Sequence, residues 1–347
     1  MKRLAAMLLL RRWWASWVAL TSTRERGTSL ARFRIAVGLV ILYSIGSMIA
    51  ADLVEVMWID AEYGGLQSLS DWHWLASALG GRTPTTAWVL VSGGLVSGAM
   101  LAVGLGGRWT ALVALQFYYA LNTAKPTLTG GYDTMVINAL WLLVLASSTA
   151  TLSLDCRLRT GSWRSDRLVP AWPRYLLILQ LLVVYGTTGL YKLSPVWVPG
   201  GSHSALWWVF QEPTWRRFDM TWLASAYPLT QLASAVTWWW EVLTPLLLLY
   251  YWARHTAERG GRLRRALLRF DLRKPWAAIG IGLHLGILAL INVGPFSLIS
   301  LSYYLCLIPP GAEPSAEPSA GAGASESADA GELADASGGE SADERRR

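Results

Sequence analysis

The stretch that decides the fold is residues 174–209, RYLLILQLLVVYGTTGLYKLSPVWVPGGSHSALWWV. It opens with an apolar run of about the 20 residues that a helix needs to cross a bilayer. The run ends at Lys192, and the Pro/Gly/Trp-rich segment that follows cannot continue the helix. A lysine at the rim of a membrane helix is costly enough to need a reason. Either it anchors the helix by extending its ammonium to the lipid headgroups, or it works as a base.

The composition is that of a polytopic membrane protein. Hydrophobic residues make up 53% of the 347 residues and charged residues only 15%, and there are 21 tryptophans. A soluble chain of this length carries more charge and shorter apolar runs. The apolar runs are continuous rather than alternating, which excludes an outer-membrane β-barrel. We therefore predict an all-α fold, a polytopic transmembrane helical bundle.

Eight apolar segments are candidate membrane spans, so we expect about eight transmembrane helices. They cover residues 33–53, 86–105, 109–124, 133–152, 173–193, 226–252, 276–293 and 295–308. The last segment is short for a crossing of about 20 residues, and we expect it to be re-entrant or tilted.

The basic residues orient these segments. With a cytoplasmic N-terminus, the inner segments hold 22 lysines and arginines and the outer segments hold five. This asymmetry follows the positive-inside rule and predicts a multi-pass protein of the plasma (cytoplasmic) membrane with both termini in the cytoplasm. Lys192 then lies at the outer end of the fifth span. Cytoplasmic loops account for the basic charge, so no nucleic-acid partner is expected.

Two segments flank the predicted transmembrane domain, which we place at residues 28–310. Residues 1–27 mix arginine with leucine, methionine and tryptophan, which is typical of an amphipathic helix on the cytoplasmic membrane surface. Residues 311–347 are low-complexity, with nine acids and three bases, and predict a disordered cytoplasmic tail. The two cysteines, Cys156 and Cys306, have no metal-type spacing, and no metal is expected.

Ionisable side chains within the predicted spans are few, which makes them informative. The candidate catalytic residues are Lys192, Glu241, His284 and Asp133. Glu241 lies near the middle of the sixth span and must be protonated, paired or turned toward a polar cavity. His284 either forms a neutral hydrogen bond between helices or has a chemical role. For Asp133, which follows two glycines, a helix N-cap is the default interpretation.

Helical spacing groups some of these residues with neighbours. Tyr185, Gly189 and Lys192 share one helix face through their i, i+4, i+7 spacing. The run of tryptophans 238–240 is typical of bulk packing, and an aromatic wall also suits a flat ring ligand. Gly282 and Gly286 form a small-xxx-small pair that predicts close helix packing. The candidate cofactor-binding residues are Tyr185, Tyr191, Trp197, Gly200 and Trp238.

Several segments together resemble one known family. They are SLARFRIAVGLVILY (29–43), GGYDTMVINALWLLVL (130–145), LQLLVVYGTTGLYKLSPVWVPGG (179–201), WWWEVLTPLLLLY (238–250) and GLHLGILALINVGPFSLISLSYYLCL (282–307). The most specific feature is a Lys-x-x-x-x-Trp-x-x-Gly pattern formed by Lys192, Trp197 and Gly200. Over residues 28–310 the chain resembles the HTTM family, the transmembrane region shared with vitamin K-dependent γ-glutamyl carboxylase.

The resemblance implies an outward-opening pocket for a reduced isoprenoid quinone. In the carboxylase, the lysine matched by Lys192 is the base that deprotonates reduced vitamin K. The oxygenated quinone then removes a γ-proton from a substrate glutamate before CO2 adds. The histidine matched by His284 belongs to the same region.

Two features depart from the carboxylase. It carries a second functional histidine near the start of the fourth helix, where this chain reads Gly131-Tyr132-Asp133. Asp133 could take the place of that histidine as a partner for Lys192. The carboxylase also has a large lumenal domain after its membrane region, where this sequence continues into an acidic tail, so peptide carboxylation is not expected.

Two functional hypotheses follow from these observations. The first is a carboxylase-like membrane enzyme, a lyase or oxidoreductase, that acts with a reduced quinone and uses Lys192 as the base. The alternative is a non-catalytic module that binds a membrane lipid, a quinone or a partner protein. A transporter ranks third, because the sequence has neither an internal repeat nor matched broken helices.

Overall fold

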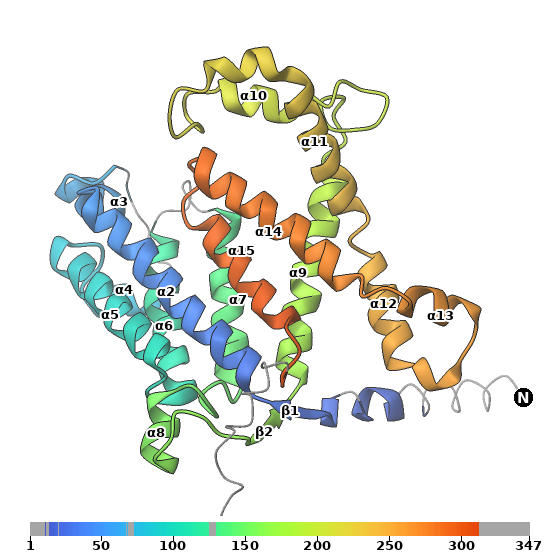
Figure 1. The fold of residues 1–347 in the computed structure, drawn as a ribbon. Helices are drawn as coiled ribbons and strands as arrows, with labels where there is room; N and C mark the ends of the chain where they lie inside the picture. The colour runs from blue at the N-terminus through green and yellow to red at the C-terminus, as the bar shows by residue number, and fades with distance from the viewer. Residues whose placement is uncertain are drawn as a thin grey trace, which may run out of the picture. The chain divides into compact units, whose positions relative to one another are not determined.

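A computed structural model describes residues 11, 14–19, 21–66, 68, 73–124 and 130–311. The regular secondary structure of these residues is almost entirely helical (Figure 1), as predicted. About half of the predicted surface helix at 1–27 lies outside the described residues, and so does the predicted tail beyond Gly311.

Helices occupy all eight apolar segments. In chain order they are α2 (Thr28–Ala50), α5 (Pro84–Val103), α6 (Gly107–Thr123), α7 (Gly131–Leu145), α9 (Trp172–Tyr191), α11 (Tyr227–Val242), α12 (Leu246–His255), α14 (Arg273–Leu290) and α15 (Phe296–Tyr304). Among the described residues, α2, α5 and α9 are long and apolar enough to cross a membrane. Residues Thr221–Val242 and Leu246–His255 form a fourth candidate, bent by 41°. The architecture is all-α with three to four candidate spans.

The bend in the fourth candidate comes from a break that the sequence analysis missed. Residues 226–252 were expected as one span, whereas α11 ends at Val242 and α12 begins at Leu246. Pro245 lies in the gap, and a proline has no backbone N–H to donate to the preceding turn. The segment therefore changes direction just after Glu241.

Short elements cover the two ends of the bundle. Helices α3 (Val54–Trp58), α4 (Trp74–Ala78) and α10 (Ala205–Gln211) lie toward one end (Figure 1), and the turns η1 (Ala61–Tyr63) and η3 (Thr221–Ala226) follow α3 and α10 in the chain. Helix α8 (Leu154–Thr160) and strands β1 (Arg24–Arg26) and β2 (Leu168–Pro170) lie at the other end (Figure 1). The strands pair antiparallel, with Glu25 opposite Val169. Helix α13 (Arg262–Leu268) follows α12 and the turn η4 (Ala257–Arg259).

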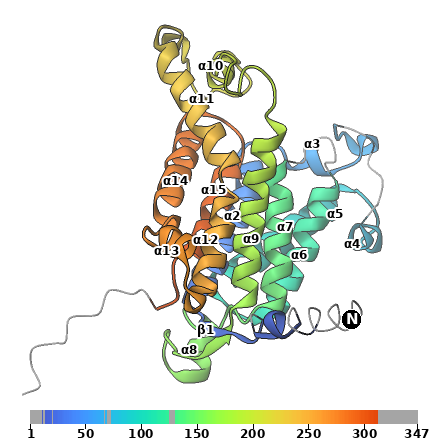
Figure 2. The same cartoon turned by 90° about the vertical axis from the view of Figure 1, so that its right-hand side faces the viewer.

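The core forms where α2 packs on α5, α5 on α6 and α6 on α7, with α15 against α2, α7 and α9 (Figure 2). Glycines allow the closest of these contacts. A Cβ added to Gly38 of α2 would lie 2.6 Å from the backbone nitrogen of Ala102, and one added to Gly98 of α5 would lie 2.9 Å from Ile41. Only a residue without a side chain permits this approach.

The predicted contact at Gly282 and Gly286 was wrong. A Cβ added to either residue would meet no described atom within 4 Å. The close contact of α14 is made by Gly280 instead, where an added Cβ would lie 2.5 Å from Trp240 and would also overlap Tyr304. The small-xxx-small spacing marks a small helix face, and it does not establish that another helix covers that face.

A buried ion pair fixes the start of α9. Arg174 donates from Nε and Nη2 to the two carboxylate oxygens of Glu25, each at 2.6 Å, and from Nη1 to the Cys306 carbonyl at 2.9 Å. At most 10% of either charged side chain is exposed. The pair ties α9 to β1 and to the turn η5 (Leu305–Leu307).

Candidate functional site

Helix α9 ends at Tyr191, as the proline- and glycine-rich segment after it predicts, and Lys192 is its C-cap residue. The Trp238 indole of α11 donates a hydrogen bond to the Lys192 carbonyl at 3.1 Å. This bond satisfies one of the carbonyls that a helix end leaves without a partner. It therefore holds the end of α9 against α11.

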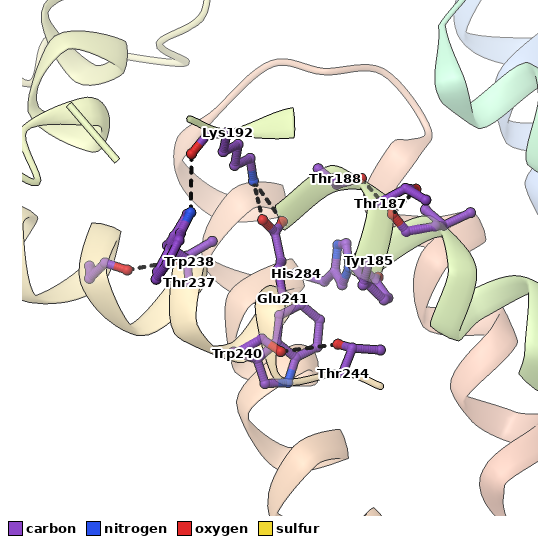
Figure 3. A network of polar contacts seen from close by, with 12 residues as sticks. Tyr185, Thr187, Thr188, Lys192, Thr237, Trp238, Trp240, Glu241, Thr244 and His284 are labelled. Carbon is purple, nitrogen blue, oxygen red and sulfur yellow. Dashed lines mark hydrogen bonds and ion pairs between the residues drawn. The ribbon is translucent and has the colours of Figure 1, made fainter. Parts of the chain in front are cut away.

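The Lys192 ammonium turns inward and forms an ion pair with Glu241 (Figure 3). Its Nζ lies 2.6 Å from Oε1 and 2.7 Å from Oε2 of the carboxylate. It also lies 4.5 Å from the centre of the Trp197 ring, within the range of a cation–π contact. The Glu241 side chain is 5% exposed and that of Lys192 is 22% exposed. This geometry differs from a headgroup anchor, in which the ammonium would extend away from the helices.

Gly189 allows the pair to form because it brings α9 and α11 close together. A Cβ added at Gly189 would lie 2.8 Å from the Glu241 Cβ and 2.9 Å from the Val242 nitrogen. Real Cβ atoms do not approach backbone this closely, so any larger residue would push the helices apart. The i, i+3 spacing to Lys192 keeps the glycine on the same side of the helix.

We expect Gly189→Ala to lower the free energy of unfolding by about 1–3 kcal/mol, because the added methyl overpacks the contact with Glu241. Gly186→Ala is the matched control on the same helix. A Cβ there would lie 3.8 Å from Pro245, which is ordinary contact, and alanine favours a helix by up to about 1 kcal/mol over glycine. The free energy of unfolding of each variant is measured in mixed detergent micelles. Equal effects of the two variants would contradict the close-contact role of Gly189.

A second polar pair lies beside the first. The Tyr185 hydroxyl of α9 and His284 Nε2 of α14 share a hydrogen bond, and both side chains are buried. Tyr185 also contacts the Trp240 ring, with ring centres 4.5 Å apart, and Trp240 stacks on Trp276 at 4.9 Å. Aromatic packing of this kind fixes the orientation of the tyrosine. The hydrogen bond thus joins α9 to α14 within a rigid wall.

These two pairs line one cavity of about 750 Å³. Its wall is mostly apolar and comes from α7, α9, α10, α11, α14 and α15 and the loops before α10, after α10 and after α14. The polar exceptions include the ion pair, the Tyr185–His284 pair, Thr188 and Gln180. A largely apolar cavity with a few convergent polar groups is the usual form of a small-molecule site.

Five of the predicted site residues line the cavity. They are Lys192, Glu241, His284, Tyr185 and Trp197. The lysine, the carboxylate and the imidazole, which lie far apart in the sequence, are thus brought to one wall by α9, α11 and α14.

The other four predicted site residues lie elsewhere. Tyr191 is 87% exposed and is not among the residues that line the cavity. Gly200 has a φ of +84° and forms an exposed turn. Trp238 is used in the hydrogen bond to the Lys192 carbonyl. Asp133 is buried and accepts hydrogen bonds from the Tyr118 hydroxyl at 2.9 Å and the Gly130 N–H at 3.0 Å; it is the third residue of α7, and the predicted N-cap position is occupied by Gly130.

The cavity also includes residues that were not predicted from the sequence. Gln180 and Val184 line it together with Thr188 and Lys192. The spacing of four residues places them on one stripe of α9, so the position of Lys192 could have identified both. Trp215 and Phe296 also line the cavity, and they lie in a loop and at a helix start where no periodic signal exists.

Comparison with known proteins gives a family but no close relative. No curated protein and no solved structure matches the chain. The HTTM domain model matches residues 23–259, which is more than half of the chain and includes Lys192 and Glu241. The match ends before α14, so it does not extend to His284. HTTM domains occur in vitamin K-dependent γ-carboxylase. The chain belongs to the HTTM family and is a helical membrane protein.

Proposed function

We propose that the cavity binds a membrane lipid with a hydroxylated ring, of the reduced isoprenoid quinone class. The observation that carries this proposal is the Lys192–Glu241 ion pair on the wall of an apolar cavity of about 750 Å³. That volume lies within the range of about 300–1,000 Å³ for small-molecule sites. The apolar wall suits an isoprenoid tail, and the ion pair suits a ring hydroxyl.

Two further features of the cavity fit such a ligand. His284 Nδ1 is buried and makes no hydrogen bond to any described residue, so it is able to bind a polar group of a ligand. The rings of Tyr185, Trp197, Trp215 and Phe296 contribute to the lining. Aromatic side chains stack on flat rings, which favours a quinone-like headgroup over an acyl chain alone.

The ion pair can move a proton between the ligand and the protein. A bound hydroquinone supplies an ionisable hydroxyl and two reducing electrons. Transfer of a proton from Lys192 to Glu241 gives a neutral amine beside a carboxylic acid, a form that a low-dielectric site favours over separated charges. The Lys192 amine is then free to accept a proton from a hydroxyl. Glu241 holds the first proton, and the new ammonium stabilises the ligand oxyanion.

The proposed topology places this cavity toward the outer face of the membrane. Eight spans with both termini in the cytoplasm would put α8 and α13, with their many arginines, on the cytoplasmic side. The end of α9 that carries Lys192 would then face outward. Helices in all eight apolar segments support this arrangement.

A second candidate function is lipid binding without chemistry. The Lys192 ammonium contacts both Glu241 oxygens and the Trp197 ring, an arrangement that is complete without any proton transfer. Such a site would hold a polar lipid headgroup and leave it unchanged. Measured turnover of a reduced quinone separates the two candidates.

Blocking the cavity tests the binding proposal. Val184→Trp adds a large ring to the cavity wall, whereas Leu190→Trp adds the same ring to an exposed position of α9 away from it. Native mass spectrometry of the detergent-solubilised protein with added short-chain menaquinol measures occupancy. We expect Val184→Trp to weaken binding by at least about tenfold, or about 1.4 kcal/mol, and Leu190→Trp to bind like the wild type. Equal binding by all three proteins would contradict the proposal.

A further inference from the structure

A second cavity lies at the opposite end of α9. Its volume is about 650 Å³, and its lining comes from β1, the first half of α9, α12, the start of α14 and the prolines at 309 and 310. Arg174 lies at this end of α9, and Lys192 at the other end is eighteen residues further along the chain. At 1.5 Å per residue, these ends are about 27 Å apart, close to the thickness of a bilayer core. The two cavities therefore lie at opposite ends of a helix that is long and apolar enough to cross a membrane.

One side of this second cavity is basic. Arg174, Arg254 and Arg273 line it, while Glu25 is the only carboxylate in the lining. Glu25 is fully engaged by Arg174 through two hydrogen bonds of 2.6 Å.

Two further carboxylates, Asp271 and Glu258, lie near this basic side of the cavity in the sequence. Neither forms an ion pair with Arg254. Asp271 accepts hydrogen bonds from Arg273 at 2.7 and 2.8 Å, and these bonds hold the pKa of Asp271 at about 2, so that pair is neutral overall. Glu258 lies on the exposed turn after α12. Arg254, in contrast, forms no ion pair with any residue in the described ranges.

Further donors surround Arg254. Arg264 of α13 packs over the Trp252 ring at 4.4 Å and donates to the Thr256 hydroxyl at 2.8 Å, and Trp252 and Thr256 both line the cavity. The Tyr251 hydroxyl also belongs to the lining, and it is buried without a hydrogen bond to any described residue. Several N–H and O–H donors thus meet around an uncompensated positive charge, which is the chemistry that binds a phosphate.

The other side of the cavity is apolar. Ile178, Leu179 and Leu182 of α9 face it, together with Leu248 of α12. Leu179 and Leu248 are exposed, at 42% and 43%. A free phosphate ion would use only the basic rim and would leave this apolar wall without a partner. A lipid with an anionic headgroup and acyl chains would contact both.

We propose that this second cavity binds an anionic phospholipid, with its phosphate at Arg254 and Arg273 and its acyl chains along α9 and α12. Basic pockets between helices at a membrane face bind such headgroups. The site is distinct from the Lys192 cavity and uses none of its residues.

Lipid titrations test the proposal. The full-length protein in detergent is titrated with phosphatidylglycerol and with phosphatidylcholine of the same acyl chains, and native mass spectrometry counts the bound lipid. We expect the wild type to bind phosphatidylglycerol at least about tenfold more tightly, a difference of about 1.4 kcal/mol. Arg254→Gln should lose this preference, whereas Arg259→Gln, which removes an exposed arginine outside the cavity, should keep it.

Two further arms identify the source of the phosphate and the role of the apolar wall. Leu179→Trp should weaken binding of phosphatidylglycerol, and Leu176→Trp, at an exposed position of α9 outside the cavity, should not. Inorganic phosphate at the same concentration should fail to compete. The proposal is overturned by equal affinity of the wild type for the two lipids, by a preference that survives Arg254→Gln, or by competition from inorganic phosphate.

Discussion

Glu241→Gln is expected to lower the free energy of unfolding by about 3 kcal/mol. The substitution leaves the Lys192 ammonium in a mostly apolar cavity without its counter-charge, and removing one partner of a buried pair costs about 3–5 kcal/mol. The lower end of that range applies because 22% of the Lys192 side chain is exposed and can recover some hydration. Lys192→Met should cost a similar amount, since it leaves the nearly fully buried carboxylate unpaired.

A double-mutant cycle isolates the pair from other effects of each substitution. The Lys192→Met/Glu241→Gln protein should lose at least about 2 kcal/mol less than the two single losses combined, because neither charge remains to be left alone. Unfolding in mixed detergent micelles provides the free energies. If the loss of the double variant equals the sum of the two single losses to within about 0.5 kcal/mol, the two side chains are not energetically coupled.

The second large effect is expected on turnover. Lys192→Ala should reduce the oxidation of a short-chain menaquinol in air-saturated detergent by at least about 100-fold, because a positioned general base contributes about 10²–10⁴-fold. Glu241→Gln should give a loss of similar size, since the amide cannot store the proton that Lys192 must release. The measurement is the absorbance change of the quinone under steady-state conditions.

Two controls keep the turnover result interpretable. Leu190→Trp, outside the cavity, should leave turnover unchanged. Glu25→Gln breaks the other buried pair of α9 and reports what a loss of stability alone does to the rate. Full turnover in a folded Lys192→Ala protein would exclude the base role and favour the lipid-binding alternative.

The sequence predicted most of the helices because each is a continuous apolar run. It also predicted the end of α9 at Lys192, since Pro195 and the residues around it cannot continue a helix. The break before α12 was missed because the leucines on both sides of Pro245 read as one apolar run. The pairing of β1 with β2 was missed because it joins segments more than 140 residues apart with no hydrophobic pattern of their own.

The candidate site was predictable as a set of residue types and only partly as a geometry. The cost of a charge in a membrane singled out Lys192 and Glu241, and the fold places the two in contact. Their pairing depends on Gly189, whose role appears only when α11 is packed against it. Tyr191 and Trp238 were also predicted as ligand contacts. In the structure Tyr191 is exposed at the last residue of α9, and the Trp238 indole donates a hydrogen bond to the Lys192 carbonyl.

The most direct test of the Lys192 cavity is an experimental structure determined with a short-chain menaquinol present. Proton exchange requires a ring oxygen within hydrogen-bond reach of the pair, at about 2.6–3.2 Å from Lys192 Nζ or a Glu241 oxygen. We predict density for the ring at that position, next to His284, in the wild type and its absence in Val184→Trp. A ring bound elsewhere, or a cavity that holds only acyl chains while menaquinol is in excess, would contradict the proposed function.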